Sequence, residues 1–282
     1  MPPPPSLATP QQRLAQLEAE MASARGAVRT MAFTLLSTRR RIFSLDAASR
    51  LAAAGRTPRS SIEFRSQVGE DMLLWDLLDS SLDGYYIEVG AFDGYDFSVS
   101  YAFDAIGWNG LLIEPIPERF EICRSRRPAA RCVNAALSRK GSLGTTKFTY
   151  TKDKWGGMLS YIAGTATADH AALVKSQRCE EVTVEVPLTT MDDVLKDHDG
   201  PIDFAVIDVE GHEEALLDGF DLRRWRPRIL MIEDNTFGRN RKLLDLITRQ
   251  GYTFVGLHEF NLVLIRSDDT ATMNKARDLG MI

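Results

Sequence analysis

The chain has 282 residues, of which 44% are hydrophobic and 26% charged, as in an ordinary globular protein. The net charge is −5, but residues 1–60 hold nine arginines, no lysine and three acids, a net +6, which leaves −11 on the remainder. An acidic body disfavours nucleic-acid binding, which depends on neutralising phosphates. The three cysteines lack paired spacing, so we expect neither a disulfide framework nor a zinc site. The chain contains no apolar run of roughly 20 residues and no signal peptide, so we expect a cytoplasmic protein.

The first part of the chain predicts a helical arm. Apolar or small residues recur in steps of three and four at Leu14, Leu17, Met21, Ala24, Val28, Met31 and Leu35. This heptad seam fits a coiled coil that joins copies of the chain into a homo-oligomer, and it also fits a helix lying on the protein's own body. The arginine run 39–41 could dock on the acidic body or contact the inner face of a membrane as a peripheral protein.

The linker that follows separates two regions. Residues 52–61 are rich in alanine, glycine, proline and serine, which is typical of a linker. We therefore divide the chain into a basic arm with its linker over 1–60 and a catalytic domain over 61–282.

Beyond the linker, apolar runs alternate with helix-length amphipathic segments, which predicts an α/β fold with a mostly parallel sheet. We expect seven strands, at 85–89, 110–114, 131–135, 203–208, 229–233, 253–257 and 262–266. Too few residues separate the last two strands for a helical crossover, so they must form an antiparallel hairpin. A parallel sheet closed by such a hairpin is the Rossmann-like plan of class I methyltransferases.

One interval is too long for a simple connection. Residues 145–186 predict an insertion that carries an extra hairpin or a lid. Within it, the segment 155–160 (WGGMLS) has the flexibility and apolar surface of an acceptor-binding loop, and a plain surface excursion with one aromatic anchor fits it equally well.

The first strand ends in a glycine turn. The order Glu88-x-Gly90-x-x-x-Gly94 places two glycines where a chain leaving a parallel sheet turns tightly against a ligand. The dinucleotide spacing G-x-G-x-x-G is absent, and the acid before the first glycine would repel a pyrophosphate. It suits the hydroxyl and amino donors of S-adenosylmethionine, although glycines serving only turn geometry remain an alternative.

Acidic or polar residues follow the other strands as well. Because ligands in parallel sheets bind at the carboxyl ends of the strands, these residues are candidates for a site. Glu114 is placed to accept hydrogen bonds from both hydroxyls of a ribose. The remaining strand ends are Asn134-Ala135, the run 208–213 (DVEGHE), and Glu233-Asp234-Asn235.

Four segments, 66–71 (SQVGED), 84–94, 107–115 and 203–213, resemble in order the FkbM family of S-adenosylmethionine-dependent methyltransferases, over roughly residues 66–266. The resemblance implies O-methylation, commonly of a sugar hydroxyl in a polysaccharide, glycolipid or glycosylated metabolite. Glu88 departs from the aspartate that is common in the family. Carried over by motif and strand end, the cofactor-binding residues would be Gln67, Glu70, Glu88, Gly90, Ala91, Asp93, Gly94, Glu114, Pro115, Asn134, Ala135 and Asp208.

The catalytic candidates implied by the same motifs are Asp208, Glu210 and His212. His212 or Asp208 could act as the general base that removes the proton of the acceptor hydroxyl. His212 also stands where a helix should begin, next to Glu213 and Glu214, and a solvated His212 without a catalytic role fits that position.

A divalent cation offers a second way to activate the hydroxyl. Asp208, Glu233 and Asp234 would supply hard oxygen ligands suited to Mg²⁺. In the alternative, Glu233 and Asn235 position the acceptor or pair with Arg239 or Arg241. Two other functions stay open: methylation of a small phenolic or polyketide acceptor, and a noncatalytic S-adenosylmethionine-binding assembly protein, which the run of acidic strand ends disfavours.

Overall fold

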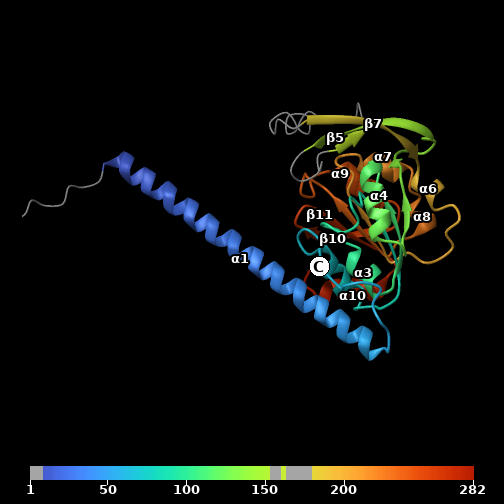
Figure 1. The fold of residues 1–282 in the computed structure, drawn as a ribbon, viewed down its shortest axis with the longest axis horizontal. Helices are drawn as coiled ribbons and strands as arrows, with labels where there is room; N and C mark the ends of the chain where they lie inside the picture. The colour runs from blue at the N-terminus through green and yellow to red at the C-terminus, as the bar shows by residue number, and fades with distance from the viewer. Residues whose placement is uncertain (1–8, 153–159, 163–179) are drawn as a thin grey trace, which may run out of the picture.

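The computed structural model of the protein describes residues 9–152, 160–162 and 180–282. A seven-stranded sheet with helices on both faces forms the body, a smaller sheet lies along one end of it, and one long helix projects from it (Figure 1).

The central sheet confirms the fold class that the sequence predicts. Its strand order is β10-β11-β9-β8-β1-β2-β3, and all strands are parallel except β11, which runs antiparallel between β9 and β10. The second strand of the hairpin, β11, therefore lies next to β9, and its first strand, β10, forms the edge of the sheet. The strands are β1 (Tyr85–Val89), β2 (Asn109–Ile113), β3 (Arg131–Val133), β8 (Phe204–Ile207), β9 (Ile229–Glu233), β10 (Tyr252–His258) and β11 (Asn261–Arg266).

The strands are apolar on both sides, and alternate residues enter two separate cores. In β8, for example, Phe204 and Val206 enter one core and Ala205 and Ile207 enter the other. The first core is covered by α2 (Glu70–Leu77), α3 (Tyr101–Ile106), α10 (Thr270–Asp278) and the end of α1 (Pro10–Ala53); the second is covered by α6 (Met191–Val194), α7 (Glu213–Asp218), α8 (Leu222–Trp225) and α9 (Arg241–Thr248). Helix α4 (Pro117–Arg126) connects β2 to β3.

A second sheet occupies the interval in which we expect a hairpin or lid. Strands β5 (Gly144–Lys152) and β7 (Glu180–Thr189) pair antiparallel along their whole length, flanked by β4 (Ala136–Leu137) and β6 (Ser160–Ile162). Its apolar face packs on Ile116 near the carboxyl end of β2. The expected acceptor loop, apart from Ser160, lies outside the described residues.

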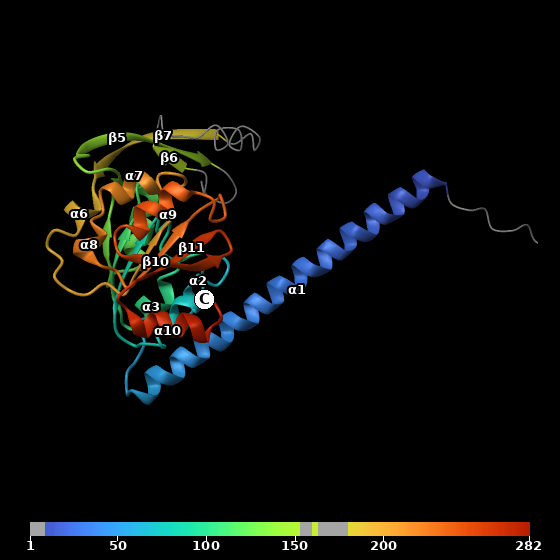
Figure 2. The same ribbon diagram turned by 180° about the vertical axis from the view of Figure 1, so that it is seen from behind.

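Helix α1 runs through the predicted arm and two residues into the predicted linker, and only its last turns contact the body (Figures 1 and 2). The predicted seam residues Leu14, Met21, Met31 and Leu35 are all more than half exposed, so the seam does not lie on the body of its own chain. Among the described residues, no helix combines the length and the apolar character that crossing a membrane requires.

Candidate active site

A pocket opens at the carboxyl ends of β1, β2 and β8, between the central sheet and the second sheet. Strand register explains why these ends meet: Val89 is paired with Ile113 on one side and with Ile207 on the other, so the loops after all three strands begin at one level. Residues far apart in the chain thereby line one cavity.

The glycine turn forms the floor of this pocket. Gly90 has φ +84°, and a Cβ at this position would lie 2.2 Å from the carbonyl oxygen of Asp208. Only glycine therefore allows the loops after β1 and β8 to pack this closely. Gly90 is therefore required for steric reasons, because a larger residue would collide with the loop after β8. Gly90 and Ala91 also line the pocket.

Glu88 reaches the pocket but uses its carboxylate within the protein. Its oxygens accept hydrogen bonds from the backbone N–H of Val99 at 2.8 Å and from the hydroxyls of Ser98 and Ser100. The carboxylate therefore holds the segment 98–100 against the end of β1, and it is 5% exposed. Glu88 therefore lines the pocket and also stabilises the pocket wall through these hydrogen bonds.

Glu114 is the acid best placed to meet a ribose. Its two oxygens accept the backbone N–H groups of Phe92, at 2.9 Å, and Ile116, at 2.8 Å, which fixes the carboxylate at the pocket wall. Burial raises the pKa of Glu114 to about 7, although the two backbone hydrogen bonds and the nearby charge of Arg119 oppose the shift. Arg119 also lies over the ring of Phe92, with 4.2 Å between its guanidinium carbon and the ring centroid.

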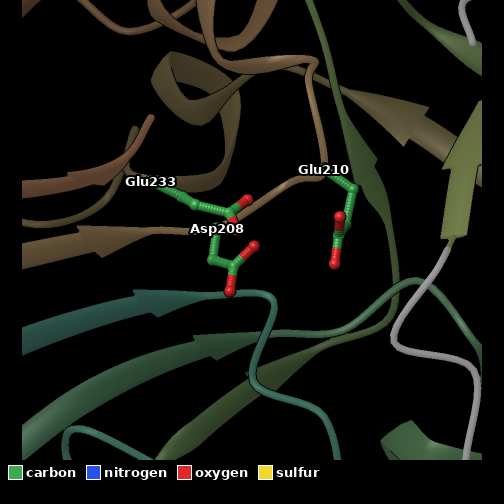
Figure 3. A group of neighbouring side chains, drawn as sticks. All are labelled: Asp208, Glu210 and Glu233. Atoms are coloured by element: carbon green, nitrogen blue, oxygen red, sulfur yellow. The ribbon is translucent and has the colours of Figure 1, made fainter. Parts of the chain in front are cut away.

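Three carboxylates gather at the ends of β8 and β9 (Figure 3). One oxygen from each of Asp208, Glu210 and Glu233 lies within 4.8 Å of the others. Glu210 adopts φ +53°, and its carboxylate lies beside that of Asp208 (Figure 3). This group differs from the predicted metal site, because it contains Glu210 in place of Asp234.

The pKa values of all three carboxyl groups in this cluster are raised. Removal from water raises the pKa values of Asp208, Glu210 and Glu233, and repulsion from Asp208 raises those of Glu210 and Glu233 further. A hydrogen bond from Glu233 to Asp208 makes Asp208 the more acidic member of that pair. Among the described residues, one oxygen of Glu233 is buried and has no hydrogen-bond partner. The shifts favour protonated Glu210 and Glu233 beside a more acidic Asp208, and a bound cation would favour the ionised form of all three.

His212 lies beside this cluster on the pocket wall, at the residue before α7. Its Nε2 is 3.0 Å from the hydroxyl oxygen of Ser138. Burial, and then the charge of Arg139, lower the pKa of His212, so the imidazole is neutral at neutral pH and able to accept a proton.

Most of the residues that the sequence proposes line the pocket. These are Gln67, Glu70, Glu88, Gly90, Ala91, Glu114, Pro115, Ala135, Asp208, Glu210 and His212.

Four proposed residues are not among those that line the pocket, and their polar groups make hydrogen bonds within the protein. Asp93 accepts the backbone N–H groups of the turn that follows it and pairs with Arg126, while the carbonyl of Gly94 accepts a hydrogen bond from the buried Arg127. The amide of Asn134 donates to the backbone carbonyls at 114 and 115 and so supports the wall.

Asp234 is the fourth. Its carboxylate accepts hydrogen bonds from the backbone of Thr236 and Gly238, and it is 5% exposed, so it closes its own turn and does not join the metal cluster. In the described part of the chain neither Arg239 nor Arg241 forms an ion pair with Glu233, so the alternative arginine pairing is also not found.

Several pocket residues are not among the candidates that the sequence provides. Phe148 and Ile162 come from the second sheet, and Phe97, Phe260 and Asn261 come from loops and the start of β11. Ser160, the last residue of the expected acceptor loop, also lines the pocket. Strand alternation marks Phe148 as inward-facing, but only the packing of the second sheet shows which surface it faces.

The strand order, the antiparallel β11 and the pocket at the strand ends define a Rossmann-like class I methyltransferase. A family model described as the methyltransferase FkbM domain matches residues 88–254, so the chain belongs to the FkbM family and is an S-adenosylmethionine-dependent methyltransferase. No curated protein matches the chain.

Solved structures similar to this chain are methyltransferases of low sequence identity. The precorrin-6y C5,15-methyltransferase of Geobacter metallireducens is 12% identical, with a TM-score of 0.39, and the match covers 72% of this chain and 89% of that one. A TehB-like S-adenosylmethionine-dependent methyltransferase of Corynebacterium glutamicum is 13% identical, with a TM-score of 0.37 and coverage of 80% and 98%. An O-methyltransferase of Bacillus cereus, in complex with S-adenosylhomocysteine, is 12% identical, with a TM-score of 0.34 and coverage of 78% and 87%.

Proposed function

We propose that the protein transfers the methyl group of S-adenosylmethionine to a hydroxyl of a saccharide. The observation that carries the proposal is the carboxylate cluster of Asp208, Glu210 and Glu233, which adjoins the glycine floor of the cofactor pocket. Sugar hydroxyls need many hydrogen-bond partners, which a group of carboxyl groups supplies. Hydroxyl acceptors also need a group that takes a proton, and Asp208 of the cluster and His212 of the same pocket are the candidates.

The residues of the pocket fit the cofactor. Gly90 leaves room for close backbone approach, and each oxygen of Glu114 retains a lone pair for a ribose hydroxyl in addition to its backbone contact. When bound, the cofactor supplies an electrophilic methyl group on a sulfonium. The protein's contribution is to align the acceptor oxygen with that methyl group and to remove the hydroxyl proton.

Two groups compete for the proton. His212 is neutral and faces the pocket, and Asp208 is the most acidic member of the cluster and therefore ionised most readily. We assign the general base to His212, because its lowered pKa keeps the imidazole neutral at neutral pH and so able to accept the hydroxyl proton.

The cluster also fits a divalent cation such as Mg²⁺. Three carboxylate oxygens within 4.8 Å, one of them on a side chain with an unpartnered buried oxygen, are hard ligands whose repulsion a cation would relieve. In that case Asp208, Glu210 and Glu233 would hold the ion, and the ion would acidify a bound hydroxyl.

The aromatic lining favours a second acceptor class. Phe97, Phe148 and Phe260 border the pocket, and aromatic rings stack on phenolic rings as well as on the apolar faces of sugars. A small phenolic or polyketide acceptor is therefore the alternative that the test must separate.

The test is transfer of labelled methyl groups. The protein is incubated with labelled S-adenosylmethionine and, separately, with nucleotide sugars, extracted glycolipids and polysaccharides, and simple phenols. Label in a glycan fraction is expected, and label in phenols would favour the alternative. Label in protein or nucleic acid alone would refute O-methylation of a small acceptor, and cofactor binding without any transfer would favour an assembly role.

The metal is tested on the same assay. Activity lost in a chelator and restored by Mg²⁺ would support the cation site, whereas full activity in the chelator would remove it. Asp208→Asn should weaken Mg²⁺ binding measured by calorimetry, and the matched variant Asp234→Asn, which alters a carboxylate outside the cluster, should not.

A further inference from the structure

Helix α1 presents two different stripes of side chains. One stripe faces the body: Phe43 packs edge-on against Phe64, with ring centroids 5.6 Å apart, and Ala47 and Leu51 are buried. Arg40 lies on the same stripe and donates to the backbone carbonyl of Ser66. This stripe accounts for the attachment of the helix to the body.

The other stripe is apolar and uncovered. It continues the heptad seam of the arm past Leu35 through Thr38, Ile42 and Leu45, still in steps of three and four. Its large side chains are 54–72% exposed, and they are Leu14, Leu17, Met21, Val28, Met31, Leu35, Ile42 and Leu45. An apolar stripe of this length in water is a docking surface. Phe33 is the one large apolar side chain of described α1 that is comparably exposed but lies off the seam.

The two stripes lie on opposite sides of the helix. If Leu14 is an a position, the seam supplies every a and d residue from Leu14 to Leu45. The body-facing residues Leu36, Arg40, Phe43, Ala47 and Leu51 then fall at positions b, f, b, f and c. A second helix could therefore cover the seam while each body stays on the outside, and the helix extends clear of the body to receive it (Figures 1 and 2).

The charged residues at the e and g positions, which flank the seam, indicate which partner fits it. In a parallel, in-register pair of identical helices, each g residue faces the e residue five positions later on the other chain. Here Arg13 faces Glu18 of the partner subunit, and Glu20 faces Arg25 of the partner subunit.

The remaining positions agree with this pairing. Arg41 faces Asp46 of the partner subunit, and within its own chain Asp46 already accepts hydrogen bonds from Arg50 and Trp75. The other two g residues, Ala27 and Thr34, are uncharged, so no like-charged pair arises. A heterologous partner or a lipid surface would not require this self-complementary pattern.

We propose that α1 pairs with α1 of a second copy of this chain in a parallel, in-register, two-stranded coiled coil over residues 14–45. The β-branched Val28 and Ile42 at a positions and the leucines Leu17 and Leu45 at d positions favour two strands. The two methyltransferase bodies then lie at the same end of the coiled coil.

Cysteine cross-linking tests the geometry. Leu17→Cys, at a seam position, should form a covalent dimer on mild oxidation, whereas Ala19→Cys, at an outer f position, and the unmodified chain should not. Sedimentation should show a dimer of the unmodified chain at micromolar concentration. A monomer, or a higher oligomer, would overturn the proposal. So would cross-linking between separately prepared Leu14→Cys and Leu45→Cys chains, which an antiparallel pair would give.

Substitutions test the surface and its charges. Val28→Asp with Met31→Asp should abolish dimerisation but leave S-adenosylmethionine binding intact, because both side chains are exposed on the seam and neither lines the cofactor pocket. Glu20→Arg should weaken the dimer about tenfold by creating like-charged pairs, and adding Arg25→Glu should restore it. Failure of the double variant to recover would contradict the charge pairing. Seam-dependent binding of a monomer to anionic vesicles would assign the surface to a membrane and overturn the dimer.

Discussion

Replacing Glu114 with glutamine tests the cofactor pocket most directly. If the carboxylate accepts hydrogen bonds from the ribose, each bond to the charged group contributes about 1.5–3 kcal/mol. Glutamine keeps one acceptor oxygen and replaces the other with a donor, so roughly one such bond is lost. We expect the dissociation constant of S-adenosylmethionine to rise roughly 10- to 100-fold. Glu118→Gln is the matched control, since Glu118 is an exposed acid at the start of α4 that does not line the pocket.

The raised pKa adds a signature in pH. Burial places the pKa of Glu114 at about 7, so the carboxylate that binds the ribose is mostly ionised at pH 8 and only about one-tenth ionised at pH 6. Cofactor affinity of the unmodified protein should therefore fall about tenfold from pH 8 to pH 6. Near pH 7, binding should release about half a proton, which calorimetry in buffers of different ionisation enthalpy measures.

The same shift affects stability with the opposite sign. Because the pKa of Glu114 is raised above its usual value of 4.5, folding favours the protonated form, and this carboxyl lowers the free energy of unfolding increasingly between pH 4.5 and about pH 7. Glu114→Gln removes that contribution. A variant that binds the cofactor as tightly as the unmodified protein, with the same pH dependence, would refute the assignment of Glu114 to the ribose.

The remaining predictions concern the supports of the pocket. Gly90→Ala should cost about 3 kcal/mol or more in thermal unfolding, because its Cβ would meet a backbone carbonyl at 2.2 Å, whereas Gly211→Ala, with φ +93° and open space around it, should cost only about 1–2 kcal/mol; equal losses would contradict the steric argument. Arg127→Leu should lower the free energy of unfolding by about 3–5 kcal/mol in urea titrations, since the buried Asp104 loses its closer ion partner, at 3.1 Å, and keeps only the partly exposed Arg59, at 3.7 Å. Arg126→Leu, at a partly exposed pair, should cost less than about 1 kcal/mol, and a similar loss in both variants would show that burial is not decisive.

Local patterns identified the sheet but not all of the site. The run at Tyr85–Val89 is apolar except for Glu88 and is followed by a glycine turn, so its type, bounds and ligand-facing end follow from the sequence alone. Asp234 shows the limit of such reasoning. Asp234 is next to Glu233 in the sequence, but its carboxylate accepts hydrogen bonds from nearby backbone N–H groups and does not join the cluster. Glu210 joins the cluster and has a left-handed backbone conformation, which the sequence pattern does not predict.

The amino-acid sequence is enough to predict the parallel sheet with its antiparallel hairpin, the glycine turn, the acidic strand ends and the helical arm, because each depends on periodicity or turn chemistry within a short segment. The three-dimensional packing is needed to learn which carboxylates converge, that Asn134 and Asp93 form hydrogen bonds within the protein, and that the second sheet brings Phe148 to the pocket. These outcomes depend on register and packing between segments far apart in the chain. The heptad pattern of α1 can be read from the sequence, but the side of the helix that stays exposed depends on how α1 packs on the body.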